Sequence, residues 1–324
     1  MARRWAFILG ILGTLASSPA WADRDTEYYT SVTVFGDSLV DAGNLYIANG
    51  GTRPNPALGY FEHRFTNGYD YPDLLSLDLF GVPTTPSLAG GSNYAFGGAR
   101  VIDTGDGIPD LAAQLTTFAA SGTGIDPNGL YIFNFGGNDV FAARGEFGPN
   151  AIGTYSSASA YLQAAAEQYV AGVQSLIDLG ARNILMTDFP LAFEPLTGEA
   201  NGYLTTALAS LTVPSDTDFF FYSLSDFNRR AVTDSASLGL PPQRTDTNCI
   251  AAGAQATGCV GIFSFDGVHA SAPVQAAGYQ ELLRTFGLAS AVPEPASWIM
   301  MILGFGAIGA AMRSRRREPA IAFA

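Results

Sequence analysis

The sequence of 324 residues contains no lysine, so all 16 of its basic residues are arginines, against 29 acidic residues. Six of the arginines lie near the two ends of the chain: Arg3, Arg4, Arg313, Arg315, Arg316 and Arg317. Without these six and Glu318, ten basic residues face 28 acidic ones, which gives a net charge of −18. A body this acidic repels nucleic acid and anionic lipid, so both are excluded as partners.

The N-terminus has the order of a secretory signal peptide, which we expect to occupy residues 1–22. Two arginines precede an apolar run over residues 5–16, and Ala20-Trp21-Ala22 follows as a small-residue cleavage site. We therefore expect signal peptidase to cleave after Ala22. A buried N-terminal helix is the alternative, and it fits the small-residue end less well.

The C-terminus, residues 292–317, has three consecutive parts. Val292-Pro293-Glu294-Pro295 precedes a charge-free apolar segment over residues 296–312, and an arginine cluster over residues 313–317 follows. Seventeen apolar residues are at the short limit for a membrane span, and the arginines favour the cytoplasmic side. This is the chain's only expected contact with a membrane.

This tail resembles the PEP-CTERM sorting signal of Gram-negative bacteria, including its Pro-Glu-Pro-Ala-Ser-Trp opening at residues 293–298. The resemblance implies cleavage near the Pro-Glu-Pro by an exosortase-type processing enzyme. It also implies delivery to the cell envelope or outside, often alongside an exopolysaccharide. The chain departs from the pattern in the seven residues that follow the arginines. A permanent C-terminal anchor is the alternative.

Only two cysteines are present, Cys249 and Cys259, and both lie in a loop rich in glycine, alanine and threonine. In an exported chain we expect a disulfide between them, worth about 2–3 kcal/mol for so short a loop. Two free buried thiols are the alternative. Two cysteines with no nearby pair of histidines cannot fill a zinc shell, so no metal site is expected.

Between the two ends, the composition predicts one globular domain over residues 28–288, because 48% of the chain is hydrophobic. Strands are predicted at residues 32–36, 130–135, 183–187 and 219–223. Helices are predicted at residues 71–79, 108–118, 157–179, 197–211, 225–237 and 271–286, with Ser271 capping the last. Alternating strands and helices favour an α/β fold with a parallel sheet covered on both faces.

The first strand stops at Gly36 and is followed by Ser38, on the turn where open α/β sheets place their ligands. A serine becomes a nucleophile only when a base takes its proton, and just two histidines exist. His269 follows Asp266 by three residues, with Gly267 between them to allow a tight bend. The carboxylate can then orient the imidazole, as a general base requires.

A serine nucleophile also needs hydrogen-bond donors for the oxyanion that forms at the carbonyl. Gly98 offers an unobstructed backbone N–H in a glycine-rich loop, and Asn138 follows the second predicted strand with a side-chain amide. The backbone N–H of Ser38 is the third candidate.

Four segments in order resemble the sequence blocks of the GDSL esterases and lipases of the SGNH hydrolase superfamily: residues 35–44, 93–99, 136–139 and 266–269. Residues 64–68 resemble a further segment common in the family. The resemblance implies a catalytic triad of Ser38, Asp266 and His269, and an oxyanion hole of Ser38, Gly98 and Asn138. Gly97 replaces Gly98 if that block begins one residue earlier. Asp41 and Asn44 would hold the loop after the nucleophile.

The resemblance also implies a three-layer α/β/α sandwich with a flavodoxin-like, five-stranded parallel sheet. Since four strands are evident, we expect the fifth between residues 82 and 93. The implied function is that of an exported serine esterase or lipase, acting through an acyl-enzyme without metal or cofactor. Its substrate would be a small-molecule, lipid or acylated-carbohydrate ester. Two alternatives are an exopolysaccharide O-acetyl esterase and a non-catalytic surface or matrix binding protein.

Some aromatic residues and the second histidine are left over by these blocks. His63 is read as a hydrogen-bonded loop residue, with a substrate contact at the rim as the alternative. Five aromatic side chains belong either to the core or to a substrate pocket: Tyr60, Phe61, Phe65, Phe141 and Phe147.

Overall fold

The computed structural model describes residues 29–148, 150–288 and 305 of the chain. The predicted signal peptide lies outside these residues, as does the predicted sorting segment apart from Phe305. The three segment boundaries therefore stay predictions. In the part of the chain that is described, no helix has the length and apolar character needed to span a membrane.

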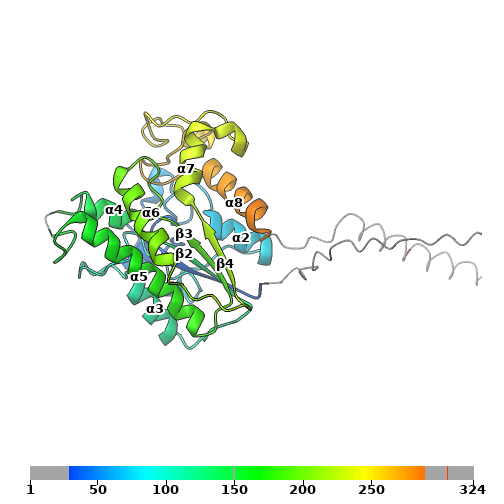
Figure 1. Ribbon diagram of the computed structural model, residues 1–324. Helices are drawn as coiled ribbons and strands as arrows, with labels where there is room; N and C mark the ends of the chain where they lie inside the picture. Colours follow the sequence, from blue (N-terminus) through cyan, green and yellow to red (C-terminus); the bar gives the residue numbers. More distant parts are fainter. Residues whose placement is uncertain (1–28, 149, 289–304, 306–324) are drawn as a thin grey trace, which may run out of the picture.

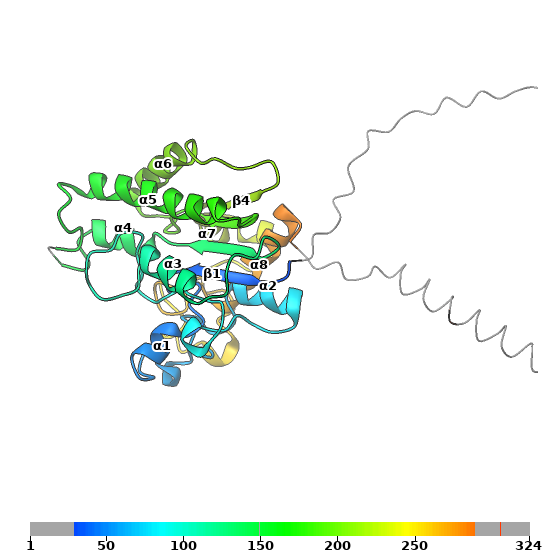
Figure 2. The same ribbon diagram turned by 90° about the horizontal axis from the view of Figure 1, so that it is seen from below.

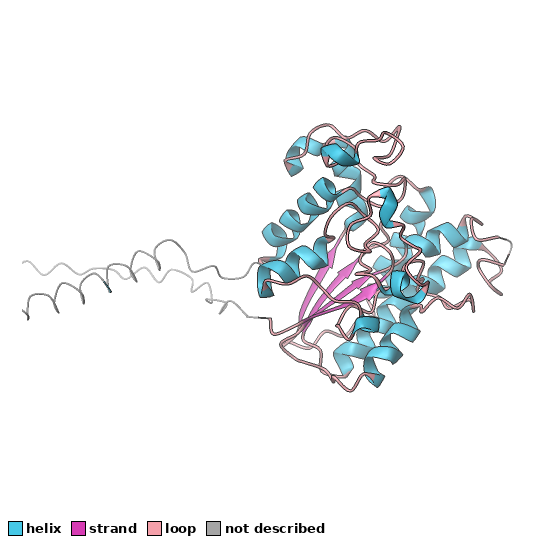
Figure 3. Ribbon diagram, turned by 180° about the vertical axis from the view of Figure 1, so that it is seen from behind, coloured by secondary structure: helices cyan, strands magenta, loops and turns pink. Residues whose placement is uncertain are grey.

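A parallel β-sheet forms the centre of the domain (Figures 1 and 3). Its strands are β1 (Val32–Gly36), β2 (Leu130–Asn134), β3 (Asn183–Thr187) and β4 (Asp218–Tyr222). They lie in the order β1-β2-β3-β4, and each pairs in parallel with its neighbour. Because the strands are parallel, all four carboxyl ends meet at one edge of the sheet.

A fifth chain segment pairs with the free side of β1. Val34 donates a backbone hydrogen bond to Ser92, and Tyr94 and Phe96 donate to Val34 and Gly36. This is a short parallel ladder over residues 92–96, slightly later in the chain than the 82–93 expected. Proline and glycine occupy much of the preceding segment, which forms a turn and the one-turn helix Ser87–Ala89 instead.

The α-helices are α1 (Asn44–Ala48), α2 (Tyr71–Phe80), α3 (Leu111–Ala120), α4 (Gly137–Ala143), α5 (Ala158–Asp178), α6 (Pro195–Leu208), α7 (Leu224–Thr233) and α8 (Ala272–Phe286). Two of them, α1 and α4, were not predicted from the sequence. The others lie within a few residues of the predicted ranges. The prediction for residues 225–237 covers α7 together with the 3₁₀ turn Ser235–Leu238.

Helices cover both faces of the sheet, since alternate strand residues point to opposite sides. Phe35 and Phe133 pack with α3, α5 and α6 in one buried cluster. Val34 and Ile132 pack with α2, α7 and α8 in the other. Figure 2 shows α5 and α6 on the opposite side of the sheet from α2 and α8. The fold is thus the expected three-layer α/β/α sandwich.

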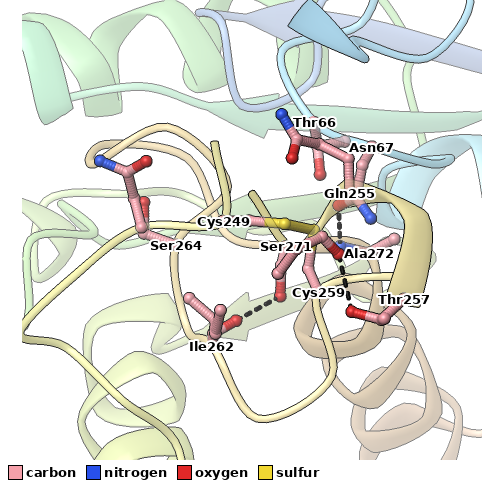
Figure 4. Close-up of a disulfide and its surroundings, with 12 residues drawn as sticks. Thr66, Asn67, Cys249, Gln255, Thr257, Cys259, Ile262, Ser264, Ser271 and Ala272 are labelled. Atoms are coloured by element: carbon pink, nitrogen blue, oxygen red, sulfur yellow. Dashed lines mark hydrogen bonds between the residues drawn. A yellow bond between two sulfur atoms is a disulfide. The ribbon is translucent and has the colours of Figure 1, made fainter. Parts of the chain in front are cut away.

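The start of α8 differs from the expectation that Ser271 caps it. Ser271 occupies the N-cap position, but its hydroxyl donates to the Ile262 carbonyl at 2.7 Å. The first helical N–H, that of Ala272, instead donates to Asn67 Oδ1 at 2.8 Å. Figure 4 shows Ser271 joined to Ile262 close to the Cys249–Cys259 disulfide.

That disulfide closes the loop that precedes residues 264–271. Its sulfur atoms are 2.01 Å apart, and both cysteines are fully buried in a small cluster with Ile262 and Phe265. Cys249 and Ile250 also donate backbone hydrogen bonds to the carbonyls of Ser264 and Phe265. The covalent loop therefore supports the segment that leads into Asp266.

Gly36 is the last residue of β1, and it packs so closely against its surroundings that a side chain at this position should destabilise the protein. A Cβ placed there would lie 2.4 Å from Val40 Cγ2 and 2.6 Å from the Asn134 carbonyl oxygen. We expect Gly36→Ala to lower the free energy of unfolding by about 1–3 kcal/mol, because the Asn134 backbone cannot move aside easily.

The matched control is Gly202→Ala in the exposed interior of α6, where a Cβ meets nothing within 4 Å. It should raise the free energy of unfolding by about 0.5–1 kcal/mol, since alanine is the better helix former. Urea unfolding of both variants measures the difference. Equal stabilities for the two would contradict the close packing at Gly36.

Candidate active site

Ser38 lies on a tight turn directly after β1. Asp37 begins the turn by donating its N–H to the Asn134 carbonyl at 3.1 Å, and its carboxylate accepts the N–H of Leu39 at 2.9 Å. Val40 closes the turn by donating to the Asp37 carbonyl. Ser38 is left partly exposed, and its own N–H has no hydrogen-bond partner in the described part of the chain.

Asp266 and His269 lie on one tight turn whose backbone is closed by a hydrogen bond from Phe265 to the His269 carbonyl, 2.7 Å long. Gly267, with φ +107°, provides the bend, which an L side chain would strain. Asp266 Oδ1 accepts the N–H groups of Val268 and His269 at 2.9 Å each. Asp266 Oδ2 is 2.7 Å from His269 Nδ1.

The turn brings His269 to Ser38, although 231 residues separate them in the chain. His269 Nε2 lies 2.7 Å from Ser38 Oγ, within hydrogen-bond distance. His269 as a whole is 8% exposed, so its imidazole is shielded from most competing water. The three side chains form a continuous Ser–His–Asp chain of hydrogen bonds.

The Asp266 carboxylate is held in its ionised form. Its burial alone would raise the pKa, but the hydrogen bonds and charge of His269 and the backbone N–H groups outweigh that effect and lower the pKa below its usual range. Asp266 therefore stays negative at neutral pH. It can stabilise a positive charge on His269.

Three residues that sequence reasoning did not assign to the site hold the Asp266–His269 turn. Tyr60 donates its hydroxyl proton to Asp266 Oδ2 at 2.8 Å, so this aromatic residue binds the carboxylate. Thr66 Oγ1 donates to the Ala270 carbonyl, and Asn67 caps α8 immediately afterwards. All three lie in or near the residue 64–68 segment, but their partners are about 200 residues away, and local sequence gives no signal of such contacts.

The segment is anchored by Arg64, which is buried and bonds to both carboxylate oxygens of Asp73. Burial would lower the pKa of Arg64, but Asp73 and the neighbouring acids outweigh it and raise the pKa further. Arg64 is therefore a fixed cation at the base of this segment.

The predicted oxyanion donors Gly98 and Asn138 line one cavity together with Ser38. Gly98 takes φ +91°, and its N–H has no partner among the described residues. Asn138, at the start of α4, donates one amide hydrogen to the Ala99 carbonyl at 2.9 Å, which leaves the second one uncommitted. Gly97 is different, because its N–H donates to Asp41 Oδ2 at 2.8 Å.

Two buried aspartates fix the loop that carries Gly98. Asp41 accepts the N–H groups of Gly43, Asn44, Leu45 and Gly97, and so joins the loop after Ser38 to the glycine-rich loop. Asp139 accepts the N–H groups of Val101 and Ile102 and the hydroxyl of Tyr161.

Asn44 adds a second connection between these loops. Its side-chain amide donates to the carbonyls of Asn93 and Ala95, at 2.7 and 2.9 Å. Together, Asp41 and Asn44 join residues about 50 positions apart in the sequence. Their contacts agree with the structural role that the family resemblance implies for both.

Asp37, next to the candidate nucleophile, is an unusual buried acid. Burial raises its pKa to about 7, with smaller contributions from the charges of Asp139 and Asp41, whereas the N–H of Leu39 lowers it. Burial likewise raises the pKa of Asp41 to about 6, despite the four N–H groups that lower it. Both acids titrate close to neutral pH.

Two cavities meet at Ser38. The first, of about 120 Å³, runs between α7, α8 and the segment after β3, and is lined mostly by apolar side chains; we call it the apolar pocket. The second, of about 670 Å³, is open and lined by Gly97, Gly98 and His269 together with Arg53, Asp106, Arg144 and Glu146; we call it the charged groove. Ser38, Asn138, Phe141 and Val268 line both.

The leftover aromatic residues have divided roles. Phe141 lines both cavities, and Phe65 and Phe147 line the charged groove. Phe61 packs edge-on against Tyr69, with ring centres 4.9 Å apart.

His63 is exposed and stacks on Tyr46, with ring centres 3.8 Å apart. Within residues 29–148 and 150–288, no group of three His, Cys, Asp or Glu side chains is arranged to hold a metal ion.

Comparison with protein families gives two matches. Residues 32–282 match the GDSL-like lipase/acylhydrolase family, and residues 291–317 match the PEP-CTERM protein-sorting motif. The first match covers most of the chain and contains all the candidate site residues.

Known relatives point the same way. Lipase 1 of Photorhabdus luminescens is 31% identical over 192 residues, which is 59% of this chain and 26% of that protein. A GDSL esterase/lipase of Arabidopsis thaliana is 31% identical over 216 residues, 55% of this chain and 59% of its own length. Esterase EstA of Pseudomonas aeruginosa is 30% identical over 177 residues, which is 41% of this chain and 25% of that protein.

The match thus spans only about a quarter to three fifths of each relative's length. The family model, by contrast, runs from the first residue of β1 almost to the end of α8. On this match, together with the α/β/α fold, the chain belongs to the GDSL-like lipase/acylhydrolase family.

Proposed function

We propose that this protein is an exported serine esterase in which Ser38 attacks the ester, His269 carries the proton and Asp266 orients and stabilises the imidazole. The observation that carries the proposal is the 2.7 Å contact of His269 Nε2 with Ser38 Oγ, continued at 2.7 Å from Nδ1 to Asp266. Such a chain of contacts activates a hydroxyl that is otherwise a weak nucleophile.

In the first half of the reaction, Ser38 Oγ forms a bond to the carbonyl carbon of the ester while its proton passes to His269 Nε2. The carbonyl π electrons move onto the oxygen, which becomes an oxyanion. As the intermediate collapses, the bond from carbon to the alcohol oxygen breaks, and His269 gives its proton to that oxygen. The alcohol leaves, and the acyl group stays on Ser38.

In the second half, water replaces the alcohol. His269 takes a proton from the water as its oxygen attacks the acyl carbon, and a second oxyanion forms. When the bond to Ser38 Oγ breaks, the proton returns to that oxygen. The products are one carboxylic acid and the free enzyme, and neither a metal nor a cofactor enters these steps.

We place the oxyanion between the N–H groups of Ser38 and Gly98 and the amide of Asn138. Two features support this: the backbone N–H groups of Ser38 and Gly98 have no partner among the described residues, and Asn138 keeps one amide hydrogen uncommitted. Gly97 is the weaker candidate because Asp41 already accepts its N–H. Donors that are fixed before the reaction stabilise the developing charge most strongly.

Export and anchoring remain proposals that rest on the two ends of the chain. The PEP-CTERM match at residues 291–317 supports sorting by an exosortase-type enzyme at the cell envelope. We propose a signal peptide over residues 1–22 and a mature domain over residues 28–288. The two alternatives are an exopolysaccharide O-acetyl esterase and a non-catalytic binding protein. Measurements of ester hydrolysis distinguish both from the proposed function.

The first prediction from this mechanism concerns the two histidines. His269→Gln should lower kcat for p-nitrophenyl butyrate by about 10⁴-fold or more, and Ser38→Ala should do the same, since both remove the activated nucleophile. His63→Gln should keep kcat within about twofold, because His63 stacks on Tyr46 outside both cavities. Steady-state hydrolysis by the purified protein measures all three.

Activity that survives in Ser38→Ala would contradict the serine mechanism. If the unmodified protein hydrolyses no ester at all, the non-catalytic alternative holds. If acetylated sugars are turned over faster than any simple ester, the O-acetyl esterase alternative holds.

The second prediction concerns the oxyanion. Asn138→Ala should lower kcat by about 10²- to 10³-fold with little change in KM, because the amide stabilises charge that exists only in the transition state. Asn228→Ala is the matched control: this asparagine lines the apolar pocket and donates to the Pro190 carbonyl. It should change KM more than kcat. A mainly KM-based effect of Asn138→Ala would contradict its place in the oxyanion hole.

A further inference from the structure

The two cavities at Ser38 differ in a way that bears on which half of the ester each one takes. Ser38 and Asn138 line both, so the reacting carbonyl carbon must lie at their junction. Of these two cavities, however, the charged groove is lined by His269 and Gly98 and the apolar pocket by neither. The two cavities are therefore not equivalent with respect to the proton donor.

The leaving oxygen must receive its proton from His269 Nε2, so it has to face the cavity that contains the imidazole. That cavity is the charged groove. The acyl chain, bonded to the opposite side of the same carbon, then points away from His269. Of the two cavities, only the apolar pocket is then left for the acyl chain.

The lining of the apolar pocket suits a hydrocarbon chain. Its walls include Leu191, Phe193, Phe227, Phe263, Val274 and Leu282. Asp37 is the only acidic or basic residue in the lining, and burial raises the pKa of its carboxyl group to about 7. Each methylene group buried against such walls raises the affinity about threefold to fourfold.

Size limits the chain that fits. The pocket has a volume of about 120 Å³, whereas an apolar cavity of about 150 Å³ holds a benzene molecule. Room for about four to six carbons follows from this comparison. The charged groove is wider, about 670 Å³, and open, with two arginines and two acids along it. Polar hydroxyl groups can hydrogen-bond to those side chains.

From this geometry we infer that the enzyme cleaves esters of short to medium aliphatic acids, about four to six carbons long, with the acyl chain in the apolar pocket and a polar alcohol in the charged groove. The assignment rests on the proposed serine mechanism and adds the substrate class to it. It distinguishes the protein both from an acetyl esterase and from a hydrolase of long acyl chains.

The test uses p-nitrophenyl esters from acetate to laurate, which share one alcohol. For the unmodified protein, kcat/KM should rise about 100-fold from acetate to hexanoate and fall for octanoate and laurate. Ala192→Phe, which fills the pocket from the segment after β3, should lower kcat/KM for hexanoate at least tenfold and for acetate less than threefold. Phe263→Ala should move the maximum to a longer chain.

The matched control is Ala171→Phe, the same substitution at an exposed position of α5 that lines neither cavity at Ser38, and it should leave the chain-length profile unchanged. Phe147→Ala, in the charged groove, should change the ratio of glyceryl butyrate to p-nitrophenyl butyrate hydrolysis but not the acyl profile. Thermal unfolding of each variant verifies that it is folded.

Two results would overturn this assignment and leave the proposed serine mechanism intact. In the first, Ala192→Phe and Phe263→Ala are both active but leave the acyl-chain profile unchanged. In the second, Phe147→Ala shifts the preferred acyl-chain length, and the two substitutions in the apolar pocket do not. The second result means that the ester binds in the reverse orientation. Absence of all ester hydrolysis in the unmodified protein overturns the proposed function and this assignment together.

Discussion

Buried carboxylates that accept backbone N–H groups hold the loops of this site in place. Asp41 accepts four such groups and joins two loops, Asp139 holds the far end of the glycine-rich loop, and Asp266 closes its own turn. Each hydrogen bond to a charged acceptor contributes about 1.5–3 kcal/mol, which offsets the cost of burying the charge. At Asp41 burial outweighs these hydrogen bonds and raises the pKa to about 6.

This construction explains how irregular loops can align a reaction. A parallel sheet brings the strand ends to one edge, but it does not fix the loops beyond them. Here one aspartate fixes the loop after Ser38, another the loop with Gly98, and Tyr60 and Thr66 the turn with His269. The 2.7 Å contact between Ser38 and His269 joins the loop after β1 to the turn that carries His269.

Much of the fold could be predicted from sequence, because its elements carry strong local signals. The strands at residues 32–36 and 183–187 are apolar runs with clear ends, and the long helix α5 has apolar residues at helical spacing with Ser157 as its cap. The fifth strand was expected too early, since its ladder at residues 92–96 is short and depends on β1. The short helices α1 and α4 were missed because they are set by their tertiary surroundings.

The residues of the candidate site also fall into two groups, those that the sequence predicts and those that it does not. Ser38, Asp266 and His269 could be named because each follows a distinctive local pattern, and the two-histidine count left little choice. Tyr60, Thr66 and Asn67 could not, because each acts through a partner about 200 residues away. The contrast between an apolar pocket and a charged groove is also a tertiary property, to which separate segments contribute.

The central claim is that Ser38 becomes covalently bonded to the acyl group, and labelling tests it most directly. A fluorophosphonate reacts with an activated serine by displacement of fluoride and leaves a stable phosphonyl group on the oxygen. Since the chain has no lysine and trypsin does not cleave between Arg53 and Pro54, trypsin releases Ser38 within the peptide of residues 25–64. The account predicts that mass spectrometry finds the phosphonyl group on Ser38 in the unmodified protein and no labelling in His269→Gln. Labelling at another residue, or equal labelling of the His269 variant, would contradict it.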